Sequence, residues 1–253
     1  MRLGNVSTEI SYYKASLATL YIYYHSRLQR REAITGTLDT VSRYLGATAW
    51  EFAEIVVVND GSRDGTADAA RAAGARVLDN PSNRGKGYSV RHGVMEAKGE
   101  WLLVSDADLS APIEELDKLW HAVDGEPSEG AIGSRALDRS LIGVHQPAFR
   151  ENVGRLFNLL MRVATGLHYH DTQCGFKFFQ AKAAREIFRR QLLDGFGFDV
   201  EVLFIAARLG YRMLEVPVRW NNVEGTTVSM WRGVAAFADP LKVRWNGIAG
   251  KYR

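Results

Sequence analysis

The chain has very little cysteine and lacks any long apolar segment. Its 253 residues include one cysteine, Cys174, and six prolines. A single cysteine excludes an internal disulfide, and the ordinary share of glycine and charged residues excludes a fibrous or disordered composition. The apolar run from Leu17 to Tyr24 is far shorter than the roughly 20 residues that cross a bilayer, and no signal-peptide cleavage pattern follows it. We therefore expect a cytoplasmic protein with no membrane-spanning segment.

Short apolar runs alternate with helical patterns between about residues 55 and 220. Four runs are typical of buried strands: 55–58, 75–78, 101–105 and 131–133. Between them, alanines recur at helical spacing after Thr66, and Pro112 precedes a second helical pattern that reaches Val123. A strand-helix-strand order predicts a single α/β domain with a mostly parallel central sheet flanked by helices.

An acidic turn follows the first of these strands, and a basic turn precedes a helix predicted from Tyr88. Asp60, with Asn59 before it, lies where open α/β sheets bind ligands, and it is a candidate to bind the nucleoside of a donor. Arg84 and Lys86 stand between glycines, an arrangement that can hold a diphosphate by charge and backbone N–H groups. Taken alone, either turn could be purely structural.

Two aspartates one residue apart end the strand 101–104. Asp106 and Asp108 can both reach one hard cation, Mg²⁺ or Mn²⁺, which would neutralise the oxygens of a nucleotide diphosphate. Two neighbouring carboxylates repel each other unless a cation is present. An isolated Asp-x-Asp is frequent by chance, so the prediction depends on the position at a strand end and on the order of the surrounding motifs.

These motifs, in this order, resemble family 2 glycosyltransferases with the GT-A fold, and within them the dolichyl- and polyprenyl-phosphate hexosyltransferase branch. The similarity extends from about residue 34 to 245. Its most specific part is Asp-Thr-Gln-Cys-Gly-Phe-Lys at 171–177, which is closer to the glucosyltransferases than to the mannosyltransferases. Further matches are Val-Asn-Asp-Gly-Ser at 58–62, Asn-Arg-Gly-Lys-Gly at 83–87, Gly-Ser-Arg at 133–135, Gly-Phe-Asp-Val-Glu at 197–201 and Glu-Val-Pro-Val-Arg-Trp at 215–220.

The resemblance implies an inverting, metal-dependent transfer of glucose from UDP-glucose to a polyprenyl or dolichyl phosphate; GDP-mannose as the donor stays open. Such a phosphate has a second pKa near about 6, so its oxygen is largely anionic at neutral pH and positioning should matter more than base catalysis. The implied roles are donor binding by Asn59, Asp60, Arg84, Lys86 and Asp106; metal binding by Asp106, Asp108 and Gln173; acceptor-phosphate binding by Arg135, Arg150 and Lys177; and catalysis by Asp199 and Asp171.

Several of these residues also have a plainer interpretation. Arg135 and Arg150 could be salt-bridged surface cations, Lys177 a solvated cation, and Asp199 the polar face of a helix. Three classes of protein remain: the transferase, a catalytically impaired relative that binds nucleotide sugars, and a sugar nucleotidyltransferase. The last would usually carry a glycine-rich basic loop near the N-terminus, and this sequence shows none there.

The N-terminal segment departs from the resemblance. Family members open with an apolar strand that ends in Pro-Ala-Tyr-Asn-Glu, whereas residues 23–31 read Tyr-Tyr-His-Ser-Arg-Leu-Gln-Arg-Arg. A set of codons for these residues, read one nucleotide later, encodes Ile-Ile-Ile-Pro-Ala-Tyr-Asn-Glu. We therefore interpret residues 1–33 as divergent or frameshifted, ahead of a glycosyltransferase domain at 34–228. If the protein has the sequence as written, we expect weaker donor binding and a weak or inactive enzyme.

The C-terminal segment, residues 229–253, is basic and contains tryptophan. Residues 205–253 hold eight Lys or Arg against three Asp or Glu, and include Trp220, Trp231 and Trp245. Cations and indole rings suit an anionic headgroup layer, so we expect contact with a membrane surface from the cytoplasmic side; a solvated basic tail is the alternative. Neither zinc-finger spacing nor a dense basic stripe is present, so we expect no nucleic-acid partner.

Overall fold

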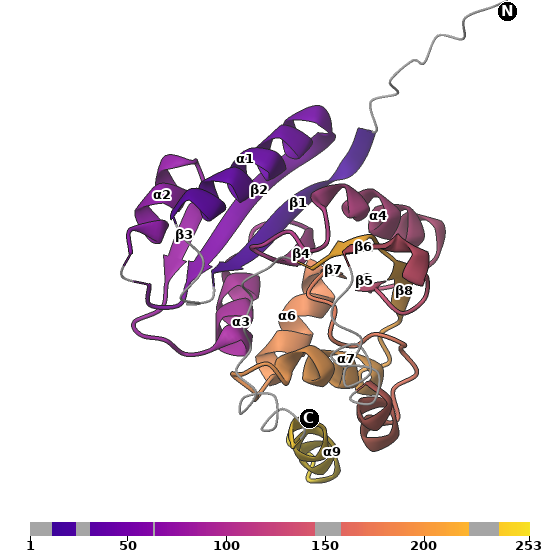
Figure 1. The fold of residues 1–253 in the computed structure, drawn as a ribbon. Helices are drawn as coiled ribbons and strands as arrows, with labels where there is room; N and C mark the ends of the chain where they lie inside the picture. The colour runs from indigo at the N-terminus through magenta and orange to yellow at the C-terminus, as the bar shows by residue number, and fades with distance from the viewer. Residues whose placement is uncertain (1–11, 24–30, 63, 145–157, 223–237) are drawn as a thin grey trace, which may run out of the picture.

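The computed structural model describes residues 12–23, 31–62, 64–144, 158–222 and 238–253. They contain a seven-stranded sheet in the order β3-β2-β1-β4-β7-β5-β8, with helices on both faces (Figure 1). Its strands are β1 (Tyr12–Tyr23), β2 (Ala49–Asn59), β3 (Arg76–Asp79), β4 (Trp101–Asp106), β5 (Gly130–Ser134), β7 (Lys177–Gln180) and β8 (Met213–Pro217). The helices include α1 (Arg31–Ala47), α2 (Thr66–Ala72), α3 (Lys86–Glu96), α4 (Leu116–Gly125), α6 (Ala181–Arg190), α7 (Phe198–Arg208) and α9 (Asp239–Ile248).

Four of the six strand pairings in this sheet are parallel, which confirms the mostly parallel sheet predicted from the sequence. The exception is β7, a four-residue strand that lies antiparallel between β4 and β5. A separate two-stranded sheet pairs β6 (Ile142–Val144) with β9 (Trp220–Asn221). The predicted strands and helices are all present, although the helix expected from Tyr88 begins at Lys86.

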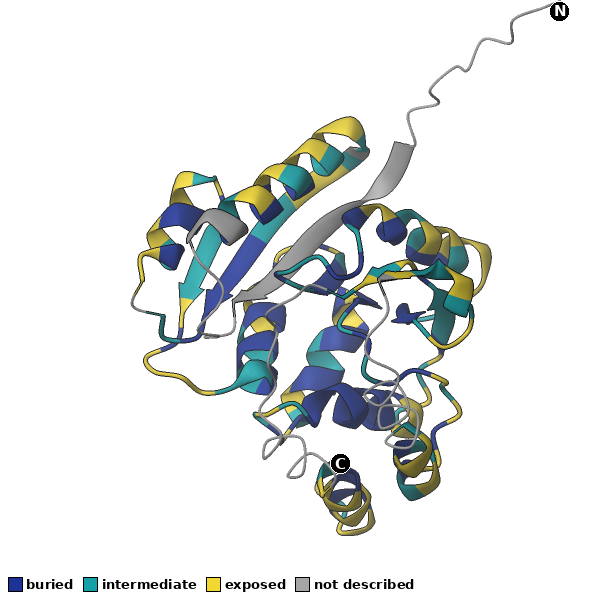
Figure 2. Cartoon of the chain, viewed as in Figure 1, coloured by how far each residue is buried: buried dark blue, intermediate teal, exposed yellow. Residues whose placement is uncertain are grey.

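The core lies on both faces of the sheet because successive strand residues point to opposite sides. Leu102 and Phe179 pack on one side with α3, α6 and α7, whereas their neighbours Leu103 and Phe178 pack on the other with α1, α2 and α4. The buried residues in Figure 2 follow this arrangement, and α7 is buried along most of its length. Packing on both faces holds the sheet in place, and this fixes the positions at which its strands end.

The described parts of both terminal segments belong to this fold. β1 lies in the middle of the sheet, where Tyr23 pairs with Asn59 and Ile22 with Asp106. Residues 24–30, which carry most of the altered motif and of the frameshift hypothesis, lie outside the described residues. At the other end, α9 packs against α7 through Val243. Within the described part of the chain, the helices are too short or too polar to cross a bilayer.

Candidate functional site

Three of the charged residues singled out in the sequence lie at or just after the carboxyl ends of strands. Asp60 follows β2, Asp106 ends β4 and Arg135 follows β5. Parallel strands end at the same edge of a sheet, and open α/β sheets bind ligands there. The structure confirms the sequence-based placement of Asp60 and Asp106 at strand ends.

The Asp60 carboxylate is fully buried and shapes the basic turn. One of its oxygens, Oδ1, accepts hydrogen bonds from the Asn80 amide and from the backbone N–H of Arg84, both at 2.8 Å. Its other oxygen accepts from the N–H of Gly85 at 2.9 Å. Asn80, which the sequence reading did not single out, is buried and also touches His92 at 2.8 Å. Asp60 thus holds the turn that carries Arg84; its predicted contact with a nucleoside stays a prediction.

Asn59, the last residue of β2, forms hydrogen bonds to the end of β3 and to the acidic turn. Its amide nitrogen donates to Asp79 at 2.8 Å, and its amide oxygen accepts from the Ser62 hydroxyl at 2.6 Å and the Ser62 N–H at 3.0 Å. The neighbouring Gly61 has a φ of +81°, and a Cβ there would lie 2.9 Å from the backbone nitrogen of Asn83. The acidic turn and the basic turn are therefore in close contact, and a side chain at Gly61 would push them apart.

Lys86 joins the basic turn to the aspartate pair. It is the first residue of α3, and its Nζ lies 2.7 Å from Asp106 Oδ1. Burial alone would lower the pKa of Lys86, but the charges of Asp106, Asp199 and Asp108 outweigh it and raise the pKa above its usual value. The ammonium group is therefore a fixed positive charge. Arg84 is exposed, and its guanidinium lies 4.3 Å from the centre of the Tyr88 ring.

The aspartate pair has the character of a cation site. Burial, and then the charge of Asp106, raise the pKa of Asp108 above its ordinary value, so its ionised form is disfavoured in this position. Ser110 offsets part of this cost, because its backbone N–H donates to Asp108 at 3.0 Å. A divalent cation would relieve the remaining repulsion.

The ligand atoms that these side chains offer fit Mg²⁺ or Mn²⁺ bound together with a diphosphate. Both ions prefer oxygen ligands, and Mg²⁺ is commonly held by one or two carboxylates plus phosphate oxygens and water. Asp106 and Asp108 supply two carboxylates, and the described residues contain no cluster of three or more His, Cys, Asp or Glu that would form a closed metal cage. Gln173, the third predicted ligand, has a buried amide nitrogen with no hydrogen-bond partner among the described residues. A metal would bind the amide oxygen, so the predicted role of Gln173 stays a prediction.

Arg135 and Asp171 form a two-point ion pair. Arg135 donates from Nε at 2.6 Å, from Nη2 at 2.9 Å and from its backbone N–H at 3.1 Å to the Asp171 carboxylate. Burial would raise the pKa of Asp171, but the Arg135 charge outweighs it and lowers the pKa. Asp171 is therefore ionised and orients the guanidinium. Arg150, the second predicted acceptor residue, lies outside the described residues.

Lys177 and Asp199 form a second ion pair, deep in the protein. The side chain of Lys177 is 1% exposed and that of Asp199 is 5% exposed, so the interpretation of either as a solvated surface charge is wrong. Lys177 also donates to the Cys174 carbonyl at 2.5 Å. Burial raises the pKa of Asp199 above its ordinary value, although Lys177 and Lys86 oppose this. An acceptor phosphate could reach Lys177 only after this pair had rearranged; that predicted contact stays a prediction.

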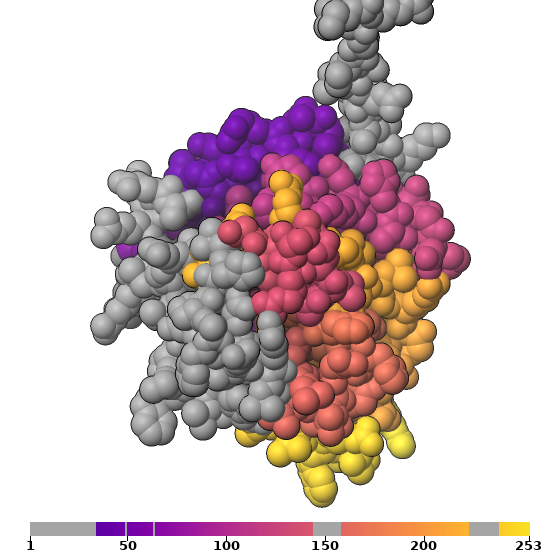
Figure 3. Space-filling model, turned by 45° about the vertical axis from the view of Figure 1, so that its right-hand side comes forward, coloured from indigo at the N-terminus to yellow at the C-terminus, as the bar shows by residue number. Residues whose placement is uncertain are grey.

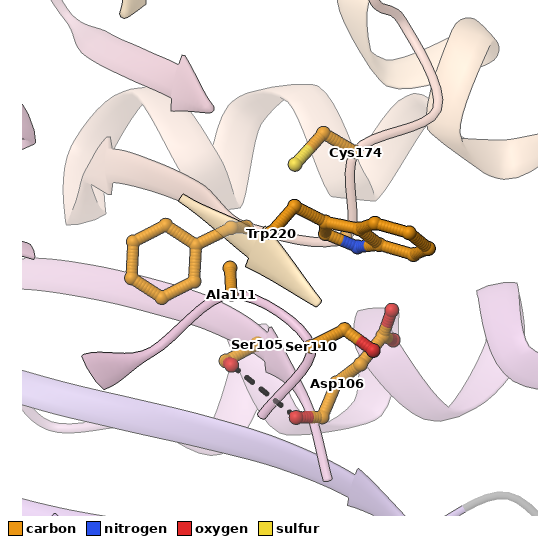
Figure 4. Close-up of a pocket in the computed structure, with 8 residues that line it drawn as sticks. Ser105, Asp106, Ser110, Ala111, Cys174 and Trp220 are labelled. Atoms are coloured by element: carbon orange, nitrogen blue, oxygen red, sulfur yellow. Dashed lines mark hydrogen bonds between the residues drawn. The ribbon is translucent and has the colours of Figure 1, made fainter. Parts of the chain in front are cut away.

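A small pocket lies beside Asp106 and is covered by Trp220. Figure 4 shows the indole between the side chains of Cys174 and Asp106. The full lining is Ser105, Asp106, Ser110, Ala111, Cys174, Gly175, Phe176 and Trp220. The Trp220 ring also lies 5.4 Å from the Arg135 guanidinium. Trp220 thus stands between the aspartate that the sequence assigns to the metal and the arginine that it assigns to the acceptor, a position that the sequence alone did not reveal.

Gly175 allows the Asp106 carboxylate to lie close against the backbone that lines this pocket. A Cβ at residue 175 would collide with the Asp106 carboxylate, and because that side chain is partly exposed it can rotate away. We expect Gly175→Ala to weaken the joint binding of Mn²⁺ and UDP-glucose by on the order of tenfold while the fold stays intact. Calorimetric titration measures the binding. Gly46→Ala, where nothing lies within 4 Å of the added carbon, is the matched control; equal binding by both variants would show that Asp106 need not hold its present position.

The sequence is similar to glycosyltransferases over most of its length. Residues 22–188 match the family described as Glycosyl transferase family 2. A dolichyl-phosphate beta-glucosyltransferase of Trichomonas vaginalis is 36% identical over 204 residues, which is 75% of this chain and 60% of that protein. The enzymes of the same name from Drosophila melanogaster and Homo sapiens are 35% and 33% identical over 79% of this chain. The chain spans 60 to 66% of the length of these three relatives.

Two kinds of solved structure share the fold at low sequence identity. Mannosyl-3-phosphoglycerate synthase from Rubrobacter xylanophilus superposes with a TM-score of 0.69 at 17% identity, over 94% of this chain and 75% of that one. Glucosyl-3-phosphoglycerate synthase from Mycobacterium tuberculosis, in complex with Mn²⁺, UDP-glucose and phosphoglyceric acid, gives 0.64 at 17% identity, over 91% and 80%. At this level of identity the likeness establishes the fold alone.

Proposed function

The chain belongs to glycosyl transferase family 2 and has its GT-A fold, and from this we propose that it transfers glucose from UDP-glucose to a dolichyl or polyprenyl phosphate, with inversion at the anomeric carbon. The curated relatives that carry the name dolichyl-phosphate beta-glucosyltransferase support the sugar and the acceptor. The observation that carries the proposal is the aspartate pair after β4, with Lys86 2.7 Å from Asp106.

The donor would bind across the ends of β2 and β4. Asp106 and Asp108 would hold Mg²⁺ or Mn²⁺, which stabilises the negative charge of the departing UDP. Asp60 keeps Arg84 in the basic turn, and Lys86 supplies a fixed positive charge beside the diphosphate. Asn59, at the end of β2, would contact the nucleoside.

The acceptor would bind beside β5. Arg135, oriented by Asp171, would hold the phosphate so that its anionic oxygen faces the anomeric carbon. A bond forms between that oxygen and the anomeric carbon as the bond to the diphosphate oxygen breaks, and UDP leaves with the electron pair. Asp199 would accept a hydrogen bond from a sugar hydroxyl and orient the ring, once its buried pair with Lys177 had rearranged toward the site.

A transfer assay tests the proposal directly. Purified protein from a gene whose reading frame has been verified is incubated with radiolabelled UDP-glucose and vesicles that contain dolichyl phosphate. We expect Mn²⁺-dependent incorporation of label into lipid, abolished by EDTA and much weaker with GDP-mannose. Donor binding without transfer would instead indicate a catalytically impaired relative. Residues 23–31, which lack the family motif, are the reason to test this alternative. Formation of pyrophosphate would indicate a nucleotidyltransferase.

The acceptor defines where the protein would act. A polyprenyl phosphate presents its phosphate at the headgroup layer, so the acceptor site must come to a membrane surface. We therefore propose a peripheral protein on the cytoplasmic side, the side on which nucleotide sugars would be supplied.

A further inference from the structure

Two helices expose apolar side chains at the end of the molecule that carries the C-terminus. On α9, Leu241, Trp245 and Ile248 are 66%, 67% and 69% exposed. The helical residues 158–165 expose Leu159, Leu160 and Val163. The yellow surface of α9 adjoins the salmon surface of the region that includes 158–165 in Figure 3, and Figure 1 places both at the same end.

Both helices are fixed to the protein by their opposite sides. Met161, from the first helix, and Val243, from α9, are buried in the same core cluster. The exposed apolar side chains therefore lie on the outward faces of two helices whose inward faces are packed in the core. Single exposed apolar residues are common on soluble proteins, but these two adjoining helices expose six between them, here called the apolar patch, and such a concentration is typical of an interaction surface.

The charges beside the patch indicate what covers it. At 100° per residue, Leu241, Trp245 and Ile248 occupy an arc of about 60° on α9, with Lys242 on one side of the arc and Arg244 on the other. Residues 239–253 hold four cations, Lys242, Arg244, Lys251 and Arg253, and one acid, Asp239, so their net charge is +3 (four minus one). An apolar stripe with tryptophan at its centre and cations on both sides is the pattern of a helix that lies in a membrane interface.

We propose that α9 and helix 158–165 together form a lipid-docking face, and that its occupant is a bilayer surface with anionic headgroups. The apolar side chains enter the boundary between headgroups and acyl chains, and the cations contact lipid phosphate. This inference deepens the proposed function by naming the surface that meets the membrane, and it rests on that function only for its biological purpose.

Series of hydrogen bonds connect the docking face to both halves of the site. Asn158 donates to the carbonyl of His170 at 2.6 Å, and the next residue is Asp171, which holds Arg135. At the C-terminal end, the Tyr252 hydroxyl donates to the buried Glu201 carboxylate at 2.8 Å.

The Glu201 contact leads on to the basic turn. Glu201 accepts from the backbone N–H groups of Leu192 and Leu193, in the segment whose Asp194 carbonyl accepts from the N–H of Tyr88 on α3.

Vesicle sedimentation of the full chain tests the docking face. The probe is vesicles of phosphatidylcholine with about 30% phosphatidylglycerol, without nucleotide sugar. We expect the wild type to sediment with them and the triple variant Leu241→Ser, Trp245→Ser, Ile248→Ser to bind at least about tenfold more weakly. The matched control is Phe52→Ser, Met95→Ser, Leu137→Ser, which removes exposed apolar side chains elsewhere and should bind as the wild type does.

Two further variants separate the contributions of the second helix and of charge. Leu159→Ser with Val163→Ser should weaken binding independently of α9, and Lys242→Gln with Arg244→Gln should weaken it most at low salt.

The proposal is overturned if the wild type stays in the supernatant, or if the α9 variant binds like the control. A dimer in analytical ultracentrifugation that the α9 variant disrupts, without vesicle binding, would also overturn it in favour of a second copy. Vesicle binding with no glucosyl transfer would contradict only the proposed function.

Discussion

Replacing Asp108 with asparagine is expected to slow glucosyl transfer by about 10²–10³-fold and, in the absence of metal, to stabilise the fold. Asparagine has nearly the same shape as aspartate and can still accept the hydrogen bond from the Ser110 backbone. It removes one of the two carboxylates available to the cation. It also removes a buried negative charge that Asp106 repels, the same repulsion that raises the pKa of Asp108. Activity and metal-free stability should therefore change in opposite directions.

Transfer rates at saturating Mn²⁺ and thermal unfolding in EDTA measure the two effects. The gain in stability should be about 1 kcal/mol or less, because Asp108 is only partly buried and Ser110 already offsets part of its cost. Asp124→Asn, an exposed acid on α4, should leave both quantities unchanged. If Asp108→Asn destabilised the metal-free protein, the pair would be a structural feature and the cation site would lose its main physical argument.

Much of the fold follows from local sequence patterns. The runs that became β2 and β4 are apolar, and acidic residues lie at or just after their ends, so both the strands and their acidic ends were predictable. β7 was not, because Lys177 to Gln180 is too short for periodicity and begins with a charged residue. A buried lysine in a central strand is possible only because Asp199, on α7, reaches it.

The pairing of the candidate site residues could not be predicted from the sequence. Arg135 and Asp171 are 36 positions apart, and nothing local indicates that one orients the other. The same holds for Lys86 with Asp106, and for Glu201 with Tyr252. Such contacts depend on how separate strands and helices assemble, which motif spacing does not record. Trp220 was noticed as a tryptophan of the basic end and as part of the motif at 215–220, but its place beside Asp106 is a result of the tertiary fold.

Replacing Lys177 with methionine is expected to destabilise the protein by about 3–5 kcal/mol. Methionine fills a similar volume, but it leaves the Asp199 carboxylate buried without its cation. The pKa of Asp199 is already raised by burial, with Lys177 among the groups that oppose the increase. Loss of Lys177 should therefore force either protonation of Asp199 or opening of the structure around it. Urea unfolding at neutral pH measures the change in the free energy of unfolding.

The double variant Lys177→Met, Asp199→Leu distinguishes loss of an ion pair from loss of packing. Replacing both partners of a buried pair by apolar residues is often neutral or stabilising, so the double variant should recover most of the stability lost by Lys177→Met alone. It should not recover transfer, because Asp199 would orient the sugar. Lys182→Met, an exposed lysine on α6, should change stability by less than about 0.5 kcal/mol. If the double variant were no more stable than Lys177→Met, the instability would come from packing around β7, and the charge of Asp199 would have no part in it.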